Sequence, residues 1–174
     1  MDDKKRNILL SKETIDERII VLGKELAKDY EGKNLYVLSL LRGSFIFTAD
    51  LVRAIDAKVK VGFMTTSSYG NSETSSGEVK IINDIPDNIE GFDVLIVDDI
   101  VDTGHTMKFI IDHVKNLGAI TVKSCVLLDK PSRRMANIHP DYCCFEIDDV
   151  FVVGYGLDYN NYYRNVPYVF NWEN

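Results

Sequence analysis

The feature that most constrains the fold is a short apolar run that ends in two acidic residues. Val94 to Val97 contains only valine, leucine and isoleucine, and Asp98-Asp99 follows it directly. A continuous apolar run of this kind is typical of a strand covered on both faces, as in a parallel sheet. Tyr36 to Leu41 is a similar run, and Val122 to Leu128 is a further predicted strand. We therefore expect a sheet with both faces buried.

Helical patterns alternate with these strands. Between residues 11 and 30, apolar side chains recur at spacings of four, three, four and four: Ile15, Ile19, Leu22, Leu26 and Tyr30. Ser11 or Thr14 can cap this helix, and Thr14 with Glu17 fits a capping box. Phe45 to Ile55 and Gly104 to Leu117 are also predicted helices, the second closed by Gly118. Alternating strands and helices indicate an α/β fold around a parallel sheet.

Three further segments complete the expected organisation. Lys58 to Met64 is a candidate strand, and Phe145 to Val153 is another, broken near Asp148-Asp149. Thr65 to Gly77 is mostly polar and has a single aromatic residue, so it can bury little apolar area. It is predicted to be either an ordinary exposed loop or a mobile lid.

Size and charge narrow the class of protein. With 174 residues, 45% of them hydrophobic, the chain is predicted to form one domain spanning residues 1–174. Its formal net charge of −7 disfavours nucleic-acid and membrane partners, which need clustered basic residues. No long apolar run and no apolar leader segment is present, so we expect a cytoplasmic protein. An odd number of cysteines without a C-x-x-C pair predicts neither a disulfide framework nor a zinc site.

The segment from Val94 to Thr106 carries the chemistry. A buried strand would deliver Asp98 and Asp99 at its carboxyl end, where open α/β sheets bind ligands. The turn that follows, from Asp102 to Thr106, leads into a helix whose first N–H groups suit a phosphate. Carboxylates beside a phosphate are compatible if the acidic pair accepts hydrogen bonds from a ribose diol. A sugar phosphate satisfies both requirements, and Mg²⁺ would relieve the remaining charge.

Other interpretations of this segment are weaker. Asp102-Thr103-Gly104 is also the aspartic-protease triplet, but that chemistry needs two such carboxylates in a β-rich fold. Phosphatases with an aspartyl nucleophile have a second acid two residues later, whereas Asp99 and Asp102 are three apart. The P-loop and Rossmann signatures are absent. A turn with only a structural role is the remaining alternative.

Val94 to Thr106 resembles the phosphoribosyl pyrophosphate motif of the type I phosphoribosyltransferases. That motif is a hydrophobic strand, two acidic residues, two apolar residues and Asp-Thr-Gly-x-Thr. The chain from about residue 8 to residue 170 resembles the hypoxanthine–guanine branch. The resemblance implies an α/β fold with a central, mainly parallel β-sheet flanked by helices, a small hood and a flexible lid loop.

The same resemblance implies an activity and partners. The enzyme would transfer the 5-phosphoribosyl group from phosphoribosyl pyrophosphate to N9 of hypoxanthine, and of guanine. The products would be IMP or GMP and pyrophosphate, in purine salvage. Mg²⁺ would be the cofactor, and a homodimer or homotetramer would be the assembly.

By resemblance, Asp98 and Asp99 hold the ribose hydroxyls and help to bind the metal. Glutamate is the commoner residue at the first position of the acidic pair, and the side chain of Asp98 is one methylene shorter than that of glutamate. Asp102 resembles the general base near purine N7. The 5′-phosphate loop consists of Thr103, Gly104, His105 and Thr106, and only the backbone of His105 is expected to contribute.

Three further places in the chain resemble the parts of the family that hold pyrophosphate and close the site. Arg42 and Gly43 resemble the pyrophosphate loop, in which a non-proline cis peptide precedes the basic residue. Arg164 resembles the arginine that contacts pyrophosphate. Ser68-Tyr69 resembles the Ser-Tyr pair of the lid.

The purine pocket is implied by the residues downstream. Lys130 resembles the lysine that donates to the 6-oxo group of the base. Phe151 would stack on the base, and the backbone of Val152 would meet its edge. Asp158 would help to hold Mg²⁺ and would lie near the purine 2-position.

Two alternatives stay open. The substrate could be another base, such as xanthine. Pyrimidine-operon attenuation proteins share this fold but bind RNA, which requires a basic face. The net charge of −7 argues against that second alternative.

Overall fold

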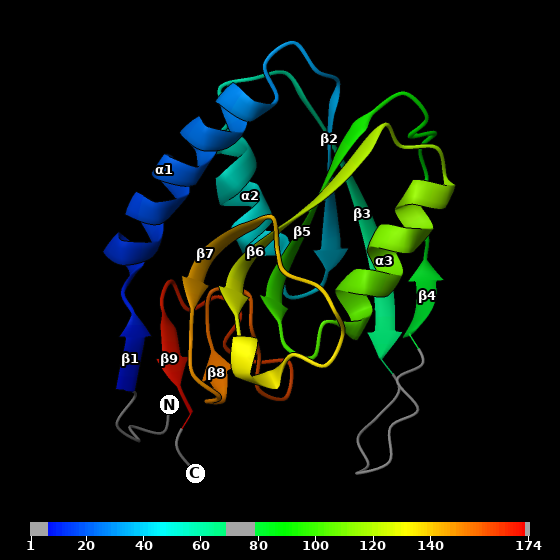
Figure 1. Ribbon diagram of the computed structural model, residues 1–174. Coiled ribbons are helices and arrows are strands. Elements are labelled where there is room, and N and C mark those ends of the chain that lie inside the picture. Colours follow the sequence, from blue (N-terminus) through cyan, green and yellow to red (C-terminus); the bar gives the residue numbers. More distant parts are fainter. Residues whose placement is uncertain (1–6, 69–78, 173–174) are drawn as a thin grey trace.

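The computed structural model describes residues 7–68 and 79–172. Its main sheet has six strands in the order β4-β3-β2-β5-β6-β7 (Figure 1). These strands are β2 (Leu35–Leu41), β3 (Val59–Ser68), β4 (Val79–Asn83), β5 (Asp93–Val101), β6 (Thr121–Asp129) and β7 (Tyr142–Glu146). All neighbours pair in parallel except β3 and β4. The predicted mainly parallel α/β sheet is therefore confirmed.

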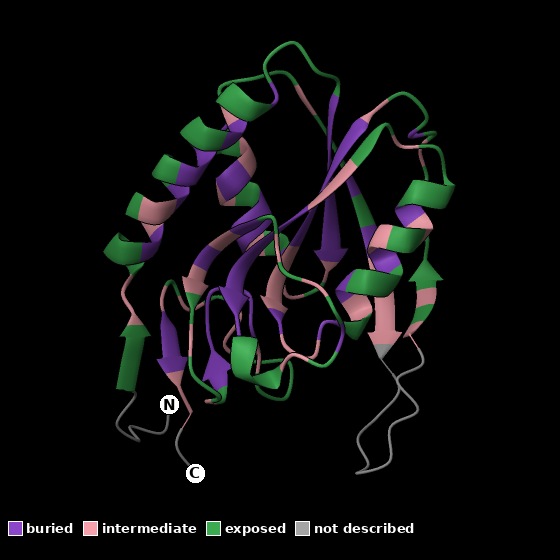
Figure 2. Ribbon diagram, viewed as in Figure 1, coloured by how far each residue is buried: buried purple, intermediate pink, exposed green. Residues whose placement is uncertain are grey.

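Helices cover both faces of this sheet. α1 (Lys12–Asp29) and α2 (Phe45–Ala54) pack on one face, and α3 (His105–Asn116) packs on the other (Figure 1). Strand β5 supplies both cores, since Leu95 and Val97 face α1 and α2 whereas Val94 and Ile96 face α3. The central strands β2 and β5 are largely buried, β3 and the edge strand β4 are partly exposed, and the helices expose their outer sides (Figure 2). Burial on both faces explains the uninterrupted apolar run.

The helix ends follow the sequence signals in most details. Ser11 is the N-cap of α1, and its hydroxyl accepts a hydrogen bond from the backbone N–H of Thr14 at 3.2 Å. The predicted capping box of Thr14 with Glu17 is wrong, because the helix already begins at Lys12. Gly118 has φ +89°, as expected of a glycine just beyond a helix end.

A second, three-stranded antiparallel sheet forms the hood. Its strands are β1 (Asn7–Leu10), β9 (Val169–Asn171) and β8 (Val152–Val153), in that order. It lies beside the carboxyl ends of β6 and β7 (Figure 1). The predicted strand from Phe145 to Val153 is thus two strands in different sheets, β7 and β8. The sequence did not indicate β1, β9 or the one-turn helix η1 (Pro131–Arg133).

The predicted loop from Thr65 to Gly77 needs correction at its start. Residues 65–68 continue β3 and pair with β4, because backbone hydrogen bonds of an antiparallel ladder need no apolar side chains. Tyr69 and the rest of that loop lie outside the described residues. In the part of the chain that the structure describes, no helix has the length and apolar character needed to span a membrane.

Candidate active site

The acidic pair stands near the carboxyl end of β5, and both side chains are half-buried. Asp98 Oδ1 accepts the backbone N–H of Asp99 at 2.9 Å, and Asp99 Oδ1 accepts that of Ile100 at 2.8 Å. Burial raises the pKa of Asp98, and the neighbouring Asp99 charge raises it further. Burial also raises the pKa of Asp99, against the effects of hydrogen bonds and the Arg164 charge. The pair is thus held by its own backbone and lacks full hydration.

The predicted pyrophosphate loop follows β2 and touches the acidic pair. The peptide bond between Leu41 and Arg42 is cis, as expected from the resemblance, and Arg42 is exposed. A Cβ placed on Gly43 would lie 1.6 Å from Asp99 Oδ2. Only glycine therefore fits at position 43, where the loop packs against the Asp99 carboxylate.

Three buried hydroxyls anchor this loop from beneath. Ser39 Oγ lies 2.8 Å from both Ser44 Oγ and Thr48 Oγ1, and Ser44 Oγ donates to the Leu40 carbonyl at 2.6 Å. These contacts join β2, the loop and α2. Sequence reasoning missed this cluster, although a serine inside the apolar run of β2 was a signal for it.

The predicted phosphate turn lies between β5 and α3. Gly104 has φ +85°, a conformation that favours glycine. The Thr103 carbonyl accepts the N–H groups of Met135 at 3.0 Å and Ala136 at 2.9 Å, which fixes the turn. A cavity of about 120 Å³ is lined by Asp98, Ile100, Val101, Asp102, Thr103, Gly104, Thr106 and Met107. His105 does not line it and is exposed.

A buried ion pair supports the turn from behind. Arg134 pairs with Asp129, and both side chains are buried. A Cβ on Gly104 would come within 3.0 Å of Arg134 Cδ and 2.7 Å of Ile138 Cγ2. Glycine at this position therefore permits both the turn and its close packing. Neither partner of this ion pair was predicted from the sequence.

The predicted purine contacts begin at the end of β6. The backbone N–H of Lys130 donates to the Val101 carbonyl at 3.0 Å, next to Asp102. The Lys130 ammonium lies 3.7 Å from Asp149 Oδ1, and Asp102 Oδ1 accepts a hydrogen bond from Arg133 Nε at 3.0 Å. Lys130 and Asp102 therefore lie at the ends of adjacent strands, but they do not contact each other: Lys130 pairs with Asp149, and Asp102 pairs with Arg133. Sequence reasoning missed Arg133 and Asp149.

The hood contributes the remaining predicted residues. Phe151 is 53% exposed and meets Tyr159 edge to face at 6.2 Å, whereas Val152 is buried in β8. An exposed aromatic face beside a buried strand is available for stacking on a ligand.

The hood approaches the pyrophosphate loop beside Arg164. Its guanidinium forms an ion pair with Asp158 at 2.6 Å and donates to the Gly156 carbonyl at 2.7 Å. A Cβ on Gly156 would lie 2.1 Å from the Gly43 carbonyl oxygen. The loop, the acidic pair and the hood are thus in direct contact.

The donor set suits a hard cation but does not enclose one. Among the described residues, no three His, Cys, Asp or Glu side chains converge. Asp98 and Asp99 offer carboxylate oxygens, while Asp158 is paired with Arg164. Mg²⁺ typically takes one or two carboxylates together with water and substrate phosphate oxygens. The residues present therefore fit a magnesium ion that is bound together with a phosphorylated ligand.

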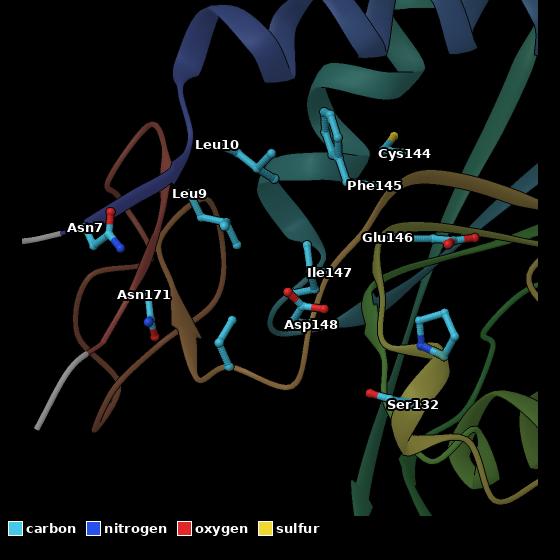
Figure 3. A pocket seen from close by; sticks show the side chains of 12 residues that line it. Asn7, Leu9, Leu10, Ser132, Cys144, Phe145, Glu146, Ile147, Asp148 and Asn171 are labelled. Atoms are coloured by element: carbon cyan, nitrogen blue, oxygen red, sulfur yellow. The ribbon is translucent and has the colours of Figure 1, made fainter.

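A cavity of about 890 Å³ lies beside this site rather than in it (Figure 3). Asn7 and Asn171 of the hood line one side, and Ser132 and Glu146 line the other. None of the predicted site residues lines it.

Comparison with known proteins agrees with this geometry. The family model "Phosphoribosyl transferase domain" matches residues 7–160. The hypoxanthine-guanine phosphoribosyltransferase of Streptococcus thermophilus is 45% identical over 164 residues, which cover 94% of this chain and 91% of that protein. The bifunctional protein TilS/HprT of Listeria monocytogenes is also 45% identical over 164 residues, but this chain spans only 25% of its length.

Solved structures lead to the same family. A crystal structure of a hypoxanthine phosphoribosyltransferase from Staphylococcus aureus superposes with a TM-score of 0.92 and 43% identity, covering 96% of this chain and 91% of that one. A ternary substrates complex of a mutant hypoxanthine phosphoribosyltransferase from Trypanosoma cruzi superposes with a TM-score of 0.90 and 39% identity, covering 97% of this chain and 95% of that one. The chain belongs to the phosphoribosyl transferase domain family, with the type I phosphoribosyltransferase fold.

Proposed function

We propose that the protein is a purine-salvage enzyme that transfers the 5-phosphoribosyl group from phosphoribosyl pyrophosphate to N9 of hypoxanthine or guanine. The products are IMP or GMP and pyrophosphate. One observation carries the proposal: the acidic pair lies between two candidate anion sites. Asp98 lines the cavity of the phosphate turn, and Asp99 abuts Gly43 of the pyrophosphate loop. Phosphoribosyl pyrophosphate has the same order, with a diol between a 5′-phosphate and a diphosphate.

Asp98 and Asp99 accept hydrogen bonds from the ribose hydroxyls. The backbone of Thr103, Gly104 and His105, with the hydroxyls of Thr103 and Thr106, holds the 5′-phosphate at the start of α3. Arg42, Gly43 and Arg164 hold the pyrophosphate, whose negative charge grows as it leaves. Asp98, Asp99 and Asp158, together with substrate oxygens, would hold Mg²⁺, which would supply electrostatic stabilisation of that charge.

The purine lies against the hood. Phe151 stacks on the ring, the backbone of Val152 meets its edge, and Asp158 lies near the 2-position. Lys130 donates to the 6-oxo group, and Asp102 accepts the proton of the base as the new bond forms at N9. Ser68 and Tyr69 belong to a lid that excludes water, which would otherwise capture the activated sugar.

The wider setting of the enzyme is also part of the proposal. We propose that it works in the cytoplasm as a homodimer or homotetramer. Val61 and Phe63 lie on one face of β3 and are both exposed, which supports association through an apolar surface. Light scattering on the purified protein would measure the assembly, and a monomer at working concentration would contradict it.

Base choice provides the test of the activity. An ammonium donates hydrogen bonds and cannot accept them, so Lys130 suits a 6-oxo group and opposes the 6-amino group of adenine. Steady-state rates with hypoxanthine, guanine, xanthine and adenine should give high activity with the first two and almost none with adenine. A site that requires one hydrogen bond can reject the wrong group by about 10⁴–10⁵. Equal use of adenine and hypoxanthine would refute the proposal, and a preference for xanthine would identify the alternative substrate.

Lys130→Gln examines the same contact directly. Loss of a charged hydrogen bond costs about 1.5–3 kcal/mol, so hypoxanthine use should fall roughly 10–150-fold. The gap to adenine should narrow, because an amide oxygen can accept from an amino group. Filter binding with RNA at two salt concentrations separates this enzyme from an RNA-binding regulator, for which retention should be strong and salt-dependent.

A further inference from the structure

Four charged side chains of alternating sign lie in a row beside the proposed purine site. Lys130 Nζ is 3.7 Å from Asp149 Oδ1. The other oxygen of Asp149, Oδ2, accepts from Arg133 Nη1 at 3.4 Å. Arg133 Nε then donates to Asp102 Oδ1 at 3.0 Å. The row therefore connects the proposed 6-oxo donor, Lys130, with the proposed proton acceptor, Asp102.

Each end of the row retains an unused polar atom. Within the described residues, Asp102 Oδ2 has no hydrogen-bond partner, and Asp149 is the one side chain that meets the Lys130 ammonium. An ammonium has three N–H donors, so contact with Asp149 leaves donors for a ligand. The Lys130 side chain is only 10% exposed, whereas that of Arg133 is 47% exposed. The row of charged side chains thus holds Lys130 and Asp102 and leaves each of them with hydrogen-bonding atoms for a ligand.

The geometry of a purine makes this arrangement useful. O6 and N7 are neighbouring atoms on one edge of the ring, so Lys130 and Asp102 have to address adjacent points. We infer that Arg133 and Asp149 are positioning residues that hold these two side chains at the spacing one purine edge requires. The guanidinium is suited to this role because its planar fork presents Nε and Nη1 to two carboxylates at once. The inference rests on the roles proposed above for Lys130 and Asp102.

A purely structural ion pair is the competing explanation. Half-exposed pairs of this kind contribute little to stability, and the hydrogen bond to Asp102 raises the pKa of Arg133, as expected of any such pair. If the ion pairs are only structural, breaking them should change the kinetic constants for both substrates alike or for neither. If they position Lys130 and Asp102, breaking them should change the kinetic constants for the purine alone.

Arg133→Gln, Asp149→Asn and the double variant separate these explanations. Steady-state kinetics with each substrate varied should show kcat/KM for hypoxanthine reduced roughly 2–5-fold in each single variant. The KM for phosphoribosyl pyrophosphate should stay at the wild-type value. The double variant should lose no more than the worse single variant, because both changes break one bridge. Arg133→Lys should not restore the rate, since an ammonium lacks the planar fork.

Lys108→Gln is the matched control. It breaks an equally exposed ion pair, Lys108 with Asp112 at 2.9 Å on α3, and should leave both KM values unchanged. Wild-type kcat/KM for hypoxanthine in both single variants would overturn the inference. Parallel increases in the KM of both substrates, or fully additive losses in the double variant, would overturn it as well. A wild-type protein inactive with hypoxanthine would instead overturn the proposed function.

Discussion

Replacing Gly43 by alanine should weaken the binding of phosphoribosyl pyrophosphate much more than that of the purine. The new Cβ would lie 1.6 Å from Asp99 Oδ2 and 2.5 Å from Asp99 Cγ. Carbon and oxygen atoms in van der Waals contact are typically more than about 3 Å apart. The carboxylate is restrained, because its other oxygen accepts the Ile100 N–H at 2.8 Å. Either Asp99 or the loop therefore has to move.

The expected magnitude follows from the contact that is lost. Once displaced, Asp99 no longer holds the ribose diol, and a hydrogen bond to a charged group contributes about 1.5–3 kcal/mol. The KM for phosphoribosyl pyrophosphate should therefore rise roughly 10–150-fold. The KM for hypoxanthine should change little, because the free base does not contact Asp99. Overpacking should also lower the free energy of unfolding by about 1–3 kcal/mol.

Initial rates at saturating hypoxanthine, together with urea unfolding, measure both effects. Gly32→Ala is the control, because a Cβ on Gly32 meets nothing within 4 Å. Gly32 has φ +73°, so this control can lose stability through backbone strain but should keep both KM values. A folded Gly43→Ala protein with wild-type KM for phosphoribosyl pyrophosphate would refute the proposed role of Asp99.

Three further predictions concern the same site. Asp102→Asn should lower kcat by roughly 10²–10⁴ with little change in the KM for phosphoribosyl pyrophosphate, and an unchanged kcat would exclude Asp102 as the base. Asp98→Asn should raise the free energy of unfolding at pH 7 by about 0.5–2 kcal/mol, because burial raises the pKa of Asp98. A raised pKa in the folded state means that stability is lost as pH rises through that value, so the stability gained by Asp98→Asn should vanish in acid. Thermal melts that show the same gain in acid as at pH 7 would contradict this. Backbone hydrogen exchange in the part of the proposed lid that follows β3, residues 69–77, should slow when IMP is bound, and equal exchange with and without IMP would argue against a lid.

The parts of the fold that the sequence predicted are those set by local pattern. In β5, neighbouring residues belong to opposite cores, Val94 facing α3 and Leu95 facing α1 and α2. A strand in that situation has to be apolar at every position, so composition alone revealed it. The turn at Gly104 was equally visible, because its positive φ and its tight packing both require glycine.

The parts that were missed depend on contacts between distant segments. β1 is a strand only because it pairs with β9, with Ile8 opposite Phe170, and no local pattern in either segment reports the other. Residues 65–68 look like a loop by composition but pair with β4, since neighbouring strands outweigh intrinsic preference. Arg133 and Asp149 could not be predicted for the same reason. Arg133 lies 31 residues from Asp102, and Asp149 lies 16 residues from Arg133 and 19 from Lys130.

Under the proposed function, the acidic pair would also explain how a chain of net charge −7 can offer a site for an anion. Asp98 and Asp99 accept hydrogen bonds from backbone N–H groups, so their carboxylates are held in place near the end of β5. A diol placed against them presents hydroxyl donors and no charge. The phosphate groups on either side would instead meet the N-terminus of α3 and the arginines of the pyrophosphate loop and hood. Because each charged part of the ligand would meet a site of opposite or neutral character, the carboxylates would select the sugar without repelling its phosphates. A ligand with phosphates at the same spacing but no diol should therefore bind more weakly than phosphoribosyl pyrophosphate.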